Sequence, residues 1–531
     1  MAEFTDVPLT PALFLERAAS VFAARTAVID GERRFTYREF GERAHRLAGL
    51  LHDARIEPGD RVAALCVNSH VMLELHNGVP MAGAVLVPMN IRLSAGELAY
   101  IIEHSGARLL IATEELAETA HKIAQQANVR LILGGSPDTE YEQLLASARP
   151  HSVRCVDEKG LLAINYTSGS TGKPKGVMYS YRGAYLQALA MAHHTRMGLG
   201  SAYLWTLPMF HCDGWCFTWG VTAAGATHVC LRRADPALAW SMICDHGITH
   251  LSGAPTVLTM IAEAAAAAPD RRPSHAVFAN TGGAPPSPAL LARLAKLDMN
   301  VTHLYGLTES YGPVMICEWQ PEWSAESPEQ QARLNARQGI GNVVTAGFDV
   351  FDAEGQPVPW DGETMGEIVL RGNNIMLGYY RDDEATRAAT VNGWFRTGDL
   401  GVRYPDGYIE LRDRAKDIII SGGENVASVE VERVLVEHPA VLEAAIVGRT
   451  DSKWGEIPVA FVVLRQGQTA SAAELIEFVR GRIAHFKAPK EIRFEELPKT
   501  STGKIQKHVL RQRAGVAGVG SHNSIPRQSS S

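Results

Sequence analysis

Hydroxyl, ammonium and glycine residues gather in one short stretch of the chain, from Asn165 to Val177. This stretch contains four Ser or Thr hydroxyls, three glycines and two lysines, and it follows the apolar run Leu161–Ile164. The apolar run predicts a buried strand, and the glycines and Pro174 that follow predict that neither strand nor helix continues. A glycine-rich loop with free backbone N–H groups beside hydroxyls and ammonium groups suits a polyphosphate. The sequence therefore predicts an enzyme that uses a nucleoside triphosphate.

The spacing in this stretch differs from that of an ordinary P-loop. A P-loop has four residues between its glycines and a Ser or Thr after its Lys. Here only Ser170 and Thr171 separate Gly169 from Gly172, and a proline follows Lys173. A surface loop rich in glycine and serine is the alternative interpretation of the stretch taken alone.

Five further segments place reactive side chains beside turns. In one of them Thr308 and Glu309 put a hydroxyl next to a carboxylate, and in another Asp399 lies in a tight turn. Lys504 lies on a second glycine loop far along the chain. The segments are Asn280–Pro286, Tyr305–Ser310, Trp394–Leu400, Asp413–Asn425 and Pro498–Ile505.

Length and composition exclude several classes of protein. With 531 residues the chain is too long for one compact core, so two or more domains are expected. An apolar content of 46% and a charged content of 21% are typical of a soluble globular protein. The net charge of −7 argues against nucleic acid as the main partner, because backbone phosphates require a basic surface.

The cysteines and the start of the chain indicate a cellular location. The seven cysteines form no CxxC pair, which predicts a reducing compartment. Cys212 and Cys216 lie near His211, but a second pair of zinc ligands is missing there. The segment Met1–Pro11 is acidic without an apolar core, so we expect no signal peptide. No apolar run approaches the roughly 18 residues that span a bilayer; a cytoplasmic protein without integral membrane association is expected.

Strand-like and helical patterns alternate along most of the chain. From Ala27 to Leu133 this alternation favours a mixed or parallel sheet covered by helices. Short strands and turns between Gly347 and Gly407 predict a smaller β subdomain. The sequence thus predicts an α/β (mixed α+β) protein with a large N-terminal domain of mixed sheets, including this β subdomain, and a small mobile α/β C-terminal domain.

We place the domain boundaries at residues 1–412, 413–515 and 516–531. The second would be the small mobile domain. The charged run Arg412–Asp417 near their border is interpreted as either a solvated turn or a hinge. The last segment is rich in Gly, Ser and Ala, and we expect a disordered tail.

Six motifs in this order resemble those of the AMP-forming acyl-CoA synthetases, the adenylating superfamily that also includes luciferases and peptide-synthetase adenylation domains. The resemblance extends from about Phe14 to Arg513. Within the superfamily, the segments Leu207–Trp219 and Tyr311–Pro313 look most like medium-chain and aromatic acyl-activating enzymes. The resemblance implies that ATP and a carboxylic acid, fatty or aryl, form an acyl-adenylate, and that the acyl group then passes to CoA.

The resemblance also implies that domain 1–412 binds AMP and the acyl group, and it implies which residues bind ATP. Gly283 and Ala284 would approach the adenine, on which Tyr305 would stack. Asp399 would accept hydrogen bonds from the ribose hydroxyls, supported by Arg414. The β- and γ-phosphates would be held by Thr167, Ser168, Gly169, Ser170, Thr171, Gly172 and Lys173.

Thr308, His211 and Lys504 are the expected catalytic residues. Thr308 would contact the α-phosphate, and Glu309 would ligate Mg²⁺ as a hard oxygen donor. Lys504 would offset the negative charge that develops when a carboxylate attacks the α-phosphorus and pyrophosphate leaves. Its neighbours Lys499 and Lys507 do not occupy the matching Thr-Gly-Lys position.

The second half-reaction is implied to need a rotation of the C-terminal domain about a hinge at Lys416. The CoA passage would be lined by Ser421, Gly422, Gly423 and Glu424, because glycines leave room for a thin pantetheine chain.

The acyl pocket is implied to include His211, Trp215, Gly282 and Gly306. A core histidine and a core tryptophan are the alternatives for the first two. Asp213 stands where close relatives often carry Asn, and Tyr181 where many carry His. A carboxylate near an anionic substrate is unfavourable unless it is paired, so Asp213 either points away or selects a substrate with a donor group.

The sequence leaves the acid and the oligomeric state open, a homodimer included. Two other functions stay possible at this point: a stand-alone enzyme that loads the phosphopantetheine of a carrier protein, and a non-catalytic nucleotide-binding protein. The presence of Glu309, Asp399 and Lys504 disfavours the last of these.

Overall fold

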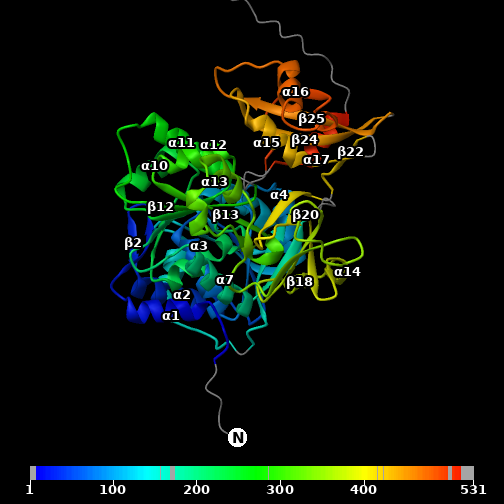
Figure 1. The fold of residues 1–531 in the computed structure, drawn as a ribbon. Coiled ribbons are helices and arrows are strands. Elements are labelled where there is room, and N and C mark those ends of the chain that lie inside the picture. Colours follow the sequence, from blue (N-terminus) through cyan, green and yellow to red (C-terminus); the bar gives the residue numbers. More distant parts are fainter. Residues whose placement is uncertain are drawn as a thin grey trace, which may run out of the picture. The chain divides into compact units, whose positions relative to one another are not determined.

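The computed structural model describes residues 7–155, 157–167, 174–284, 286–414, 416–421, 424–451, 453–499 and 505–515. They form two compact units, and Figure 1 shows their helices and strands. The first unit holds the described residues up to Thr397 together with Gly401–Leu411; the second holds Gly398–Leu400 and the described residues from Arg412 onward. The predicted tail lies outside the described residues. None of the described helices is long and apolar enough to cross a membrane.

Two large mixed sheets form the centre of the first unit, which confirms the predicted fold class. The nine-stranded sheet has the order β15-β14-β13-β12-β11-β9-β10-β1-β2, and the seven-stranded sheet has the order β18-β8-β7-β4-β3-β5-β6. The strands of the former are β1 (Thr26–Asp30), β2 (Arg33–Thr36), β9 (Ala202–Leu204), β10 (Thr227–Cys230), β11 (His250–Gly253), β12 (Val277–Thr281), β13 (Met299–Leu307), β14 (Gly312–Ile316) and β15 (Ile340–Gly341). Those of the latter are β3 (Arg61–Leu65), β4 (Val85–Pro88), β5 (Ala107–Thr113), β6 (Arg130–Gly134), β7 (Leu161–Thr167), β8 (Lys175–Ser180) and β18 (Gly378–Tyr379).

A smaller sheet corresponds to the predicted β subdomain. It has the order β16-β17-β20-β19, with β21 also paired to β20. Its strands are β16 (Gly347–Phe351), β17 (Gly366–Arg371), β19 (Thr390–Val391), β20 (Trp394–Arg403) and β21 (Ile409–Arg414).

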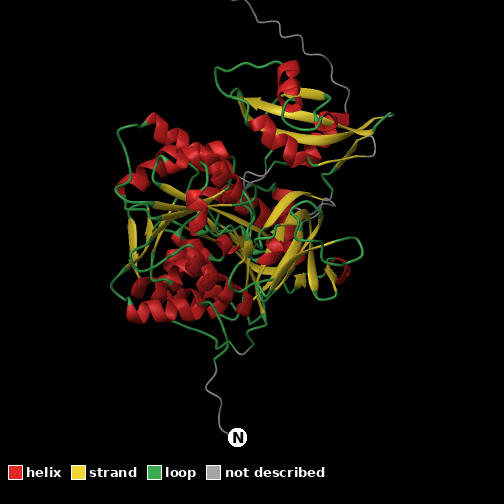
Figure 2. Cartoon of the chain, viewed as in Figure 1, coloured by secondary structure: helices red, strands yellow, loops and turns green. Residues whose placement is uncertain are grey.

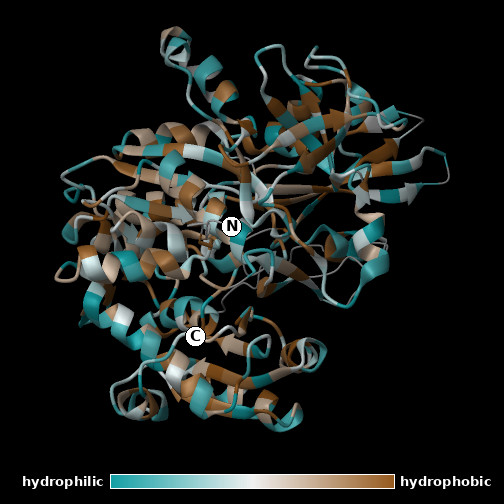
Figure 3. Ribbon diagram, turned by 90° about the horizontal axis from the view of Figure 1, so that it is seen from below, coloured by the Kyte–Doolittle hydropathy of each residue, from teal (hydrophilic) through white to brown (hydrophobic). Residues whose placement is uncertain are grey.

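Helices cover both faces of the large sheets (Figure 2). Successive residues of a strand point to opposite faces: Val62 and Ala64 of β3 join a core that both sheets share, whereas Ala63 and Leu65 join a core on the other face. Apolar residues accordingly concentrate along the strands (Figure 3). The helices and helical turns are α1 (Ala12–Val21), α2 (Tyr37–Asp53), α3 (His70–Met81), α4 (Ala95–Ser105), η1 (Glu114–Leu116), α5 (Ala117–Gln126), α6 (Glu140–Ser147), α7 (Tyr181–His194), α8 (Cys212–Trp215), α9 (Phe217–Ala223), α10 (Pro236–Asp245), α11 (Pro255–Ala267), α12 (Pro288–Ala295), η2 (Thr308–Ser310), η3 (Pro321–Ala325), α13 (Pro328–Asn335) and α14 (Asp383–Ala388).

Helix α3 is buried along its whole length, although it carries His70, Glu74 and His76. A buried ionisable group needs a partner. The Nδ1 atom of His70 lies 2.6 Å from Asp30, and Arg43 binds Glu74 at 2.5 Å. These pairs fix α3 against α2 and β1.

The second unit is a small α/β structure. Its sheet has the order β23-β22-β25-β24, and β26 also pairs with β25. The elements are β22 (Ile419–Ser421), β23 (Glu424–Val426), α15 (Ser428–Val436), β24 (Val441–Asp451), β25 (Gly455–Leu464), α16 (Ala472–Arg480), η4 (His485–Lys487), β26 (Glu491–Phe494) and α17 (Lys507–Gly515).

The charged run Arg412–Asp417 is not the solvated turn that was one of its two interpretations. Strand β21 continues to Arg414, and Asp413 is buried, where its carboxylate accepts a hydrogen bond from the backbone N–H of Ser428. Asp417 binds Arg511 of α17. The run is therefore tied to two helices of the second unit.

The pairing of α3 predicts how the stability of the first unit depends on pH. Burial alone would raise the pKa of Asp30, but hydrogen bonds from His70 and Arg232 outweigh it and lower that pKa far below its usual value. A depressed carboxyl pKa contributes stability above the unfolded-state value of about 4, and this stability is lost as the pH falls. We expect Asp30→Asn to lower the free energy of unfolding at pH 7 by about 3–5 kcal/mol, and to flatten its decline below about pH 4. Urea unfolding between pH 3 and 7 measures both the free energy of unfolding and its decline with pH. If this free energy fell below pH 4 as steeply in the variant as in the wild type, the stabilising role of the Asp30 carboxylate would be contradicted.

Candidate active site

The predicted phosphate loop connects the two strands of a hairpin. Strands β7 and β8 are antiparallel, with Thr167 opposite Lys175, so residues 168–173, which lie outside the described residues, join two adjacent strand ends. The expectation that Gly176 interrupts the strand is wrong. A Cβ atom at this position would lie 2.8 Å from the side chain of Ile164, so the glycine serves packing inside β8 and not a turn.

Two stacked tyrosines connect this hairpin to the segment that carries Thr308. The Tyr179 hydroxyl donates to the Thr308 carbonyl at 2.6 Å, and its ring lies 3.9 Å from that of Tyr311. The Tyr311 hydroxyl accepts the backbone N–H of Ser180 at 2.5 Å. Burial raises the pKa of both tyrosines, so both stay neutral and act as fixed hydrogen-bonding groups.

Glu309 is half-buried and is held at two points. Its Oε1 atom accepts a hydrogen bond from Tyr379 at 2.8 Å, and its carbonyl accepts the N–H of Met376 at 2.8 Å. In the described part of the chain, no group of three or more His, Cys, Asp or Glu side chains is arranged so that it could hold a metal ion. A single oriented carboxylate fits Mg²⁺, which is commonly held by one or two carboxylates together with the phosphates of its substrate.

An unusual left-handed turn carries Trp215, one of the predicted acyl-pocket residues. Cys212, Asp213, Gly214, Trp215 and Cys216 have φ values of 51°, 51°, 63°, 56° and 60°. A left-handed conformation costs roughly 1–2 kcal/mol for each residue other than glycine, and it persists only where the surroundings fix it. The segment assigned to α8 is thus a strained turn that follows His211.

The structure brings Trp215 and Gly282 together. A Cβ atom on Gly282 would lie 3.2 Å from the Trp215 ring, and one on Gly312 would lie 3.0 Å from it. A Cβ on Gly306 would clash at 1.9 Å with the Gly312 carbonyl oxygen. The indole therefore packs against Gly282 and Gly312, and only 7% of Trp215 is exposed.

His211 and Thr308 meet on the thiol of Cys212. The Sγ atom lies 3.8 Å from Nε2 of His211 and 3.7 Å from Oγ1 of Thr308. Burial raises the pKa of this thiol to about 12, so it stays protonated and unreactive. Two of the three expected catalytic side chains consequently border the same group.

The expected adenine and ribose residues lie in different surroundings. Gly283, with φ of 85°, and Ala284 are exposed, so a ligand can approach their backbone. Tyr305 is 9% exposed and packs in a core with Val314. In the second unit, Oδ1 of Asp399 lies 3.2 Å from Nε of Arg414, which brings that predicted pair together.

Three further predicted residues of the second unit can be placed. Ser421 and Glu424 pair across the β22–β23 hairpin, at the loop expected to line the CoA passage. The Lys416 carbonyl accepts a hydrogen bond from Arg511 at 3.0 Å, and burial, with help from Arg414, lowers the pKa of the Lys416 amine. Gly422, Gly423 and Lys504 lie outside the described residues.

The lysines that flank Lys504 in the sequence, Lys499 and Lys507, each form an ion pair with a glutamate. Lys499 binds Glu443 at 2.6 Å, and Lys507 binds Glu432 at 2.7 Å. Burial alone would lower the pKa of Lys507, but nearby carboxylates outweigh it and raise that pKa. Both lysines therefore have structural partners.

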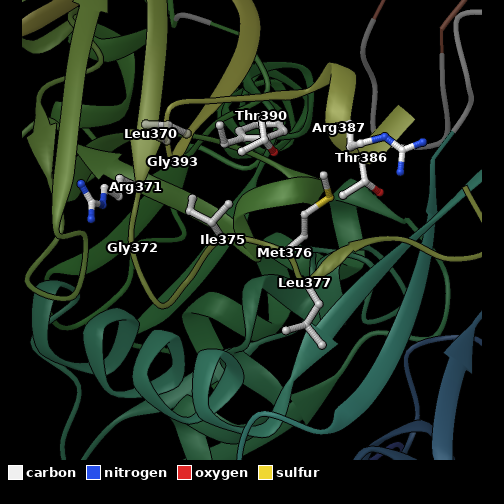
Figure 4. A pocket seen from close by; sticks show the side chains of 11 residues that line it. Leu370, Arg371, Gly372, Ile375, Met376, Leu377, Thr386, Arg387, Thr390 and Gly393 are labelled. Carbon is white, nitrogen blue, oxygen red and sulfur yellow. The ribbon is translucent and has the colours of Figure 1, made fainter. Parts of the chain in front are cut away.

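A cavity of about 590 Å³ lies between β17, α14 and β20 (Figure 4). Its apolar lining includes Ile375 and Met376, and Arg371 and Arg387 lie on opposite sides of it. None of the residues predicted from the sequence lines this cavity. It is adjacent to the site through Met376, whose N–H binds Glu309.

Sequence reasoning missed Tyr179, Tyr379 and His76. Tyr379 belongs to the segment Gly378–Tyr380, whose glycine and paired aromatics could have drawn attention. No local pattern marked Tyr179 or His76, because their partners lie far away in the sequence. Tyr181, one of the two departures from the family pattern, begins α7 and packs in the shared core.

Residues 15–380 match the AMP-binding enzyme family, and residues 430–504 match the AMP-binding enzyme C-terminal domain. The chain is 43% identical to an acetate–CoA ligase of Humulus lupulus, over 96% of this chain and 95% of the relative. It is also 43% identical to a peroxisomal acetate/butyrate–CoA ligase of Arabidopsis thaliana, over 95% and 94%. Among solved structures, o-succinylbenzoate–CoA synthetase of Bacillus subtilis with its acyl-adenylate superposes with a TM-score of 0.83 at 28% identity, over 98% of this chain and 100% of that one.

These matches extend over nearly the whole chain and include both units. Enzymes of this family use ATP, with Mg²⁺, to convert a carboxylic acid to an acyl-adenylate, and they transfer the acyl group to CoA. The chain belongs to the AMP-binding enzyme family and is an adenylate-forming acyl-CoA synthetase.

Proposed function

We propose that the acid activated by this chain is a short aliphatic acid, of the size range from acetate to butyrate. The observation that carries this proposal is the position of Trp215, whose indole occupies the space over Gly282 and Gly312. A pocket closed by a buried indole leaves little length for an acyl chain. The names of two relatives, which refer to acetate and butyrate, support the same size.

We also propose the following roles at the ATP site. Thr167 and residues 168–173 hold the β- and γ-phosphates, and Thr308 contacts the α-phosphate. Gly283 and Ala284 receive the adenine against Tyr305, and Asp399 with Arg414 holds the ribose. Mg²⁺ at Glu309 supplies charge neutralisation to the phosphates. The β7–β8 hairpin, the two stacked tyrosines and the Tyr379–Glu309 bond support the roles of Thr167, Thr308 and Glu309, because they hold these residues in place.

For the attack itself, we propose that Lys504 stabilises the charge on the α-phosphate and that His211 borders the acid. Electrostatic stabilisation by an oriented charge is typically the largest catalytic contribution. Transfer to CoA follows after a movement about Lys416 at the border of the domains 1–412 and 413–515, with Ser421–Glu424 lining the CoA passage. The hydrogen bond from Arg511 to Lys416 supports a defined pivot.

A cytoplasmic location and a homodimeric state are further proposals. All seven cysteines are unpaired, which supports a reducing compartment. The Arabidopsis relative is named peroxisomal, so microscopy of a fluorescent fusion has to decide between the two locations. Sedimentation velocity tests the oligomeric state.

Replacing Lys504 by Ala tests the assignment of the catalytic charge. We expect acid-dependent pyrophosphate release to fall at least about a hundredfold, while conversion of supplied acyl-adenylate and CoA to thioester is retained. Lys499→Ala is the matched control and should leave both reactions unchanged, because Lys499 binds Glu443. Full pyrophosphate release by the Lys504 variant would exclude the role.

Substituting Trp215 tests the proposed acid size. Trp215→Gly removes the indole and also suits the positive φ at this position. We expect kcat/KM for hexanoate to rise at least about tenfold relative to acetate. Trp240→Phe, at a buried tryptophan of another core, controls for the general loss of a large side chain. An unchanged ratio of hexanoate to acetate would show that Trp215 does not limit the acyl chain.

A further inference from the structure

Asp213 is completely buried and lies at the centre of the left-handed turn. Its Oδ2 atom accepts a hydrogen bond from the side chain of Asn165 at 2.9 Å. Its Oδ1 atom lies 3.2 Å from Nε2 of His76, and both of these side chains have no exposed surface. A carboxylate in this position needs compensation for its charge.

The hydrogen bonds of His76 determine where a proton must lie. Its Nδ1 atom lies 2.7 Å from the Met72 carbonyl, which can only accept, so Nδ1 carries a hydrogen. In a neutral ring, Nε2 would then present a lone pair to the lone pairs of Oδ1. Among the described residues, neither Nε2 of His76 nor Oδ1 of Asp213 has another hydrogen-bond partner. A proton between these two atoms removes the repulsion and satisfies both.

The titratable groups around the pair stay neutral, so none of them supplies a positive charge to the carboxylate of Asp213. Burial raises the pKa of Cys216 and Tyr179, and it raises the pKa of Cys212 to about 12. Burial also raises the pKa of Tyr311. In strand β10, burial and the neighbouring His76 lower the pKa of His228 to about 3.

The hydrogen bond between Asn165 and Asp213 also joins two parts of the predicted site. Asn165 belongs to β7 and lies two residues before Thr167, where the predicted phosphate loop begins. Asp213 belongs to the turn that follows His211 and includes Trp215. Thr218 further fixes the turn by donating to the Asp213 carbonyl at 2.9 Å.

We propose that Asp213 and His76 share one proton, and that Asp213 is a positioning residue that fastens the acid-binding turn to the phosphate-loop strand without a net charge behind the acid. The proposal rests on the proposed function, because it takes His211 and Trp215 as neighbours of the acid. It resolves the two alternatives left by the sequence: the carboxylate points away from the acid, and it is compensated by His76.

A rescue experiment separates this role from a general structural one. His76→Gln removes the proton and leaves a buried uncompensated carboxylate, which repels the anionic substrate. We expect the KM for acetate to rise at least about tenfold, while the KM for ATP changes less than about threefold. Asp213→Asn alone should stay within about threefold of the wild type, because its amide can donate to neutral His76 and accept from Asn165.

The double variant His76→Gln with Asp213→Asn has no buried charge and should recover a KM for acetate within about threefold of the wild type. Additive losses in the double variant would overturn the proposal. So would an Asp213→Asn variant as impaired as His76→Gln, since the carboxylate would then be needed for itself.

Spectroscopy of the substrate-free enzyme tests the proton directly. We expect either an imidazolium signal of His76 in ¹⁵N-histidine NMR or a carboxylic acid C=O band in the infrared, lost in Asp213→Asn. A neutral His76 together with an ionised Asp213 would overturn the proposal. Because no substrate is involved, the spectroscopic result is independent of the proposed function. A wild-type enzyme that releases no pyrophosphate when an acid is supplied would count against the proposed function alone.

Discussion

The complete burial of helix α3 is the constraint on which the first unit depends. An apolar helix placed between two sheets needs no further explanation, but α3 also carries His70, Glu74 and His76. Each of them can be buried only with a partner, and the partners come from different elements: Asp30 from β1, Arg43 from α2 and Asp213 from the left-handed turn. The ionisable groups of one helix thus fix the positions of its neighbours.

The same constraint explains how a strained turn can persist near the site. Four residues other than glycine adopt positive φ between positions 212 and 216, and the cost of several kcal/mol must be offset by contacts. Asn165, His76 and Thr218 provide these contacts on one side of the turn. On its other side the Trp215 ring rests on the backbone of Gly282 and Gly312. The geometry of this turn is therefore set by buried polar groups from other elements.

The sequence predicted the alternation of strands and helices and the family, because these depend on local composition and motif spacing. It failed where a residue acts through a distant partner. Gly176 looked like a strand breaker, yet its lack of a side chain makes room for Ile164 in the paired strand. Tyr379 lies 70 residues from Glu309, and no spacing rule links them. The orientation of Asp213 stayed open for the same reason, since it depends on His76 and Asn165 from two other elements.

Isotope transfer tests the central claim, that the acid attacks the α-phosphorus of ATP and forms an acyl-adenylate. The enzyme is given ATP, CoA and acetate labelled with ¹⁸O in both carboxyl oxygens, and the products are weighed by mass spectrometry. The account predicts that AMP gains one ¹⁸O atom and that pyrophosphate gains none. Labelled orthophosphate together with ADP would instead reveal an acyl-phosphate route and would contradict the account.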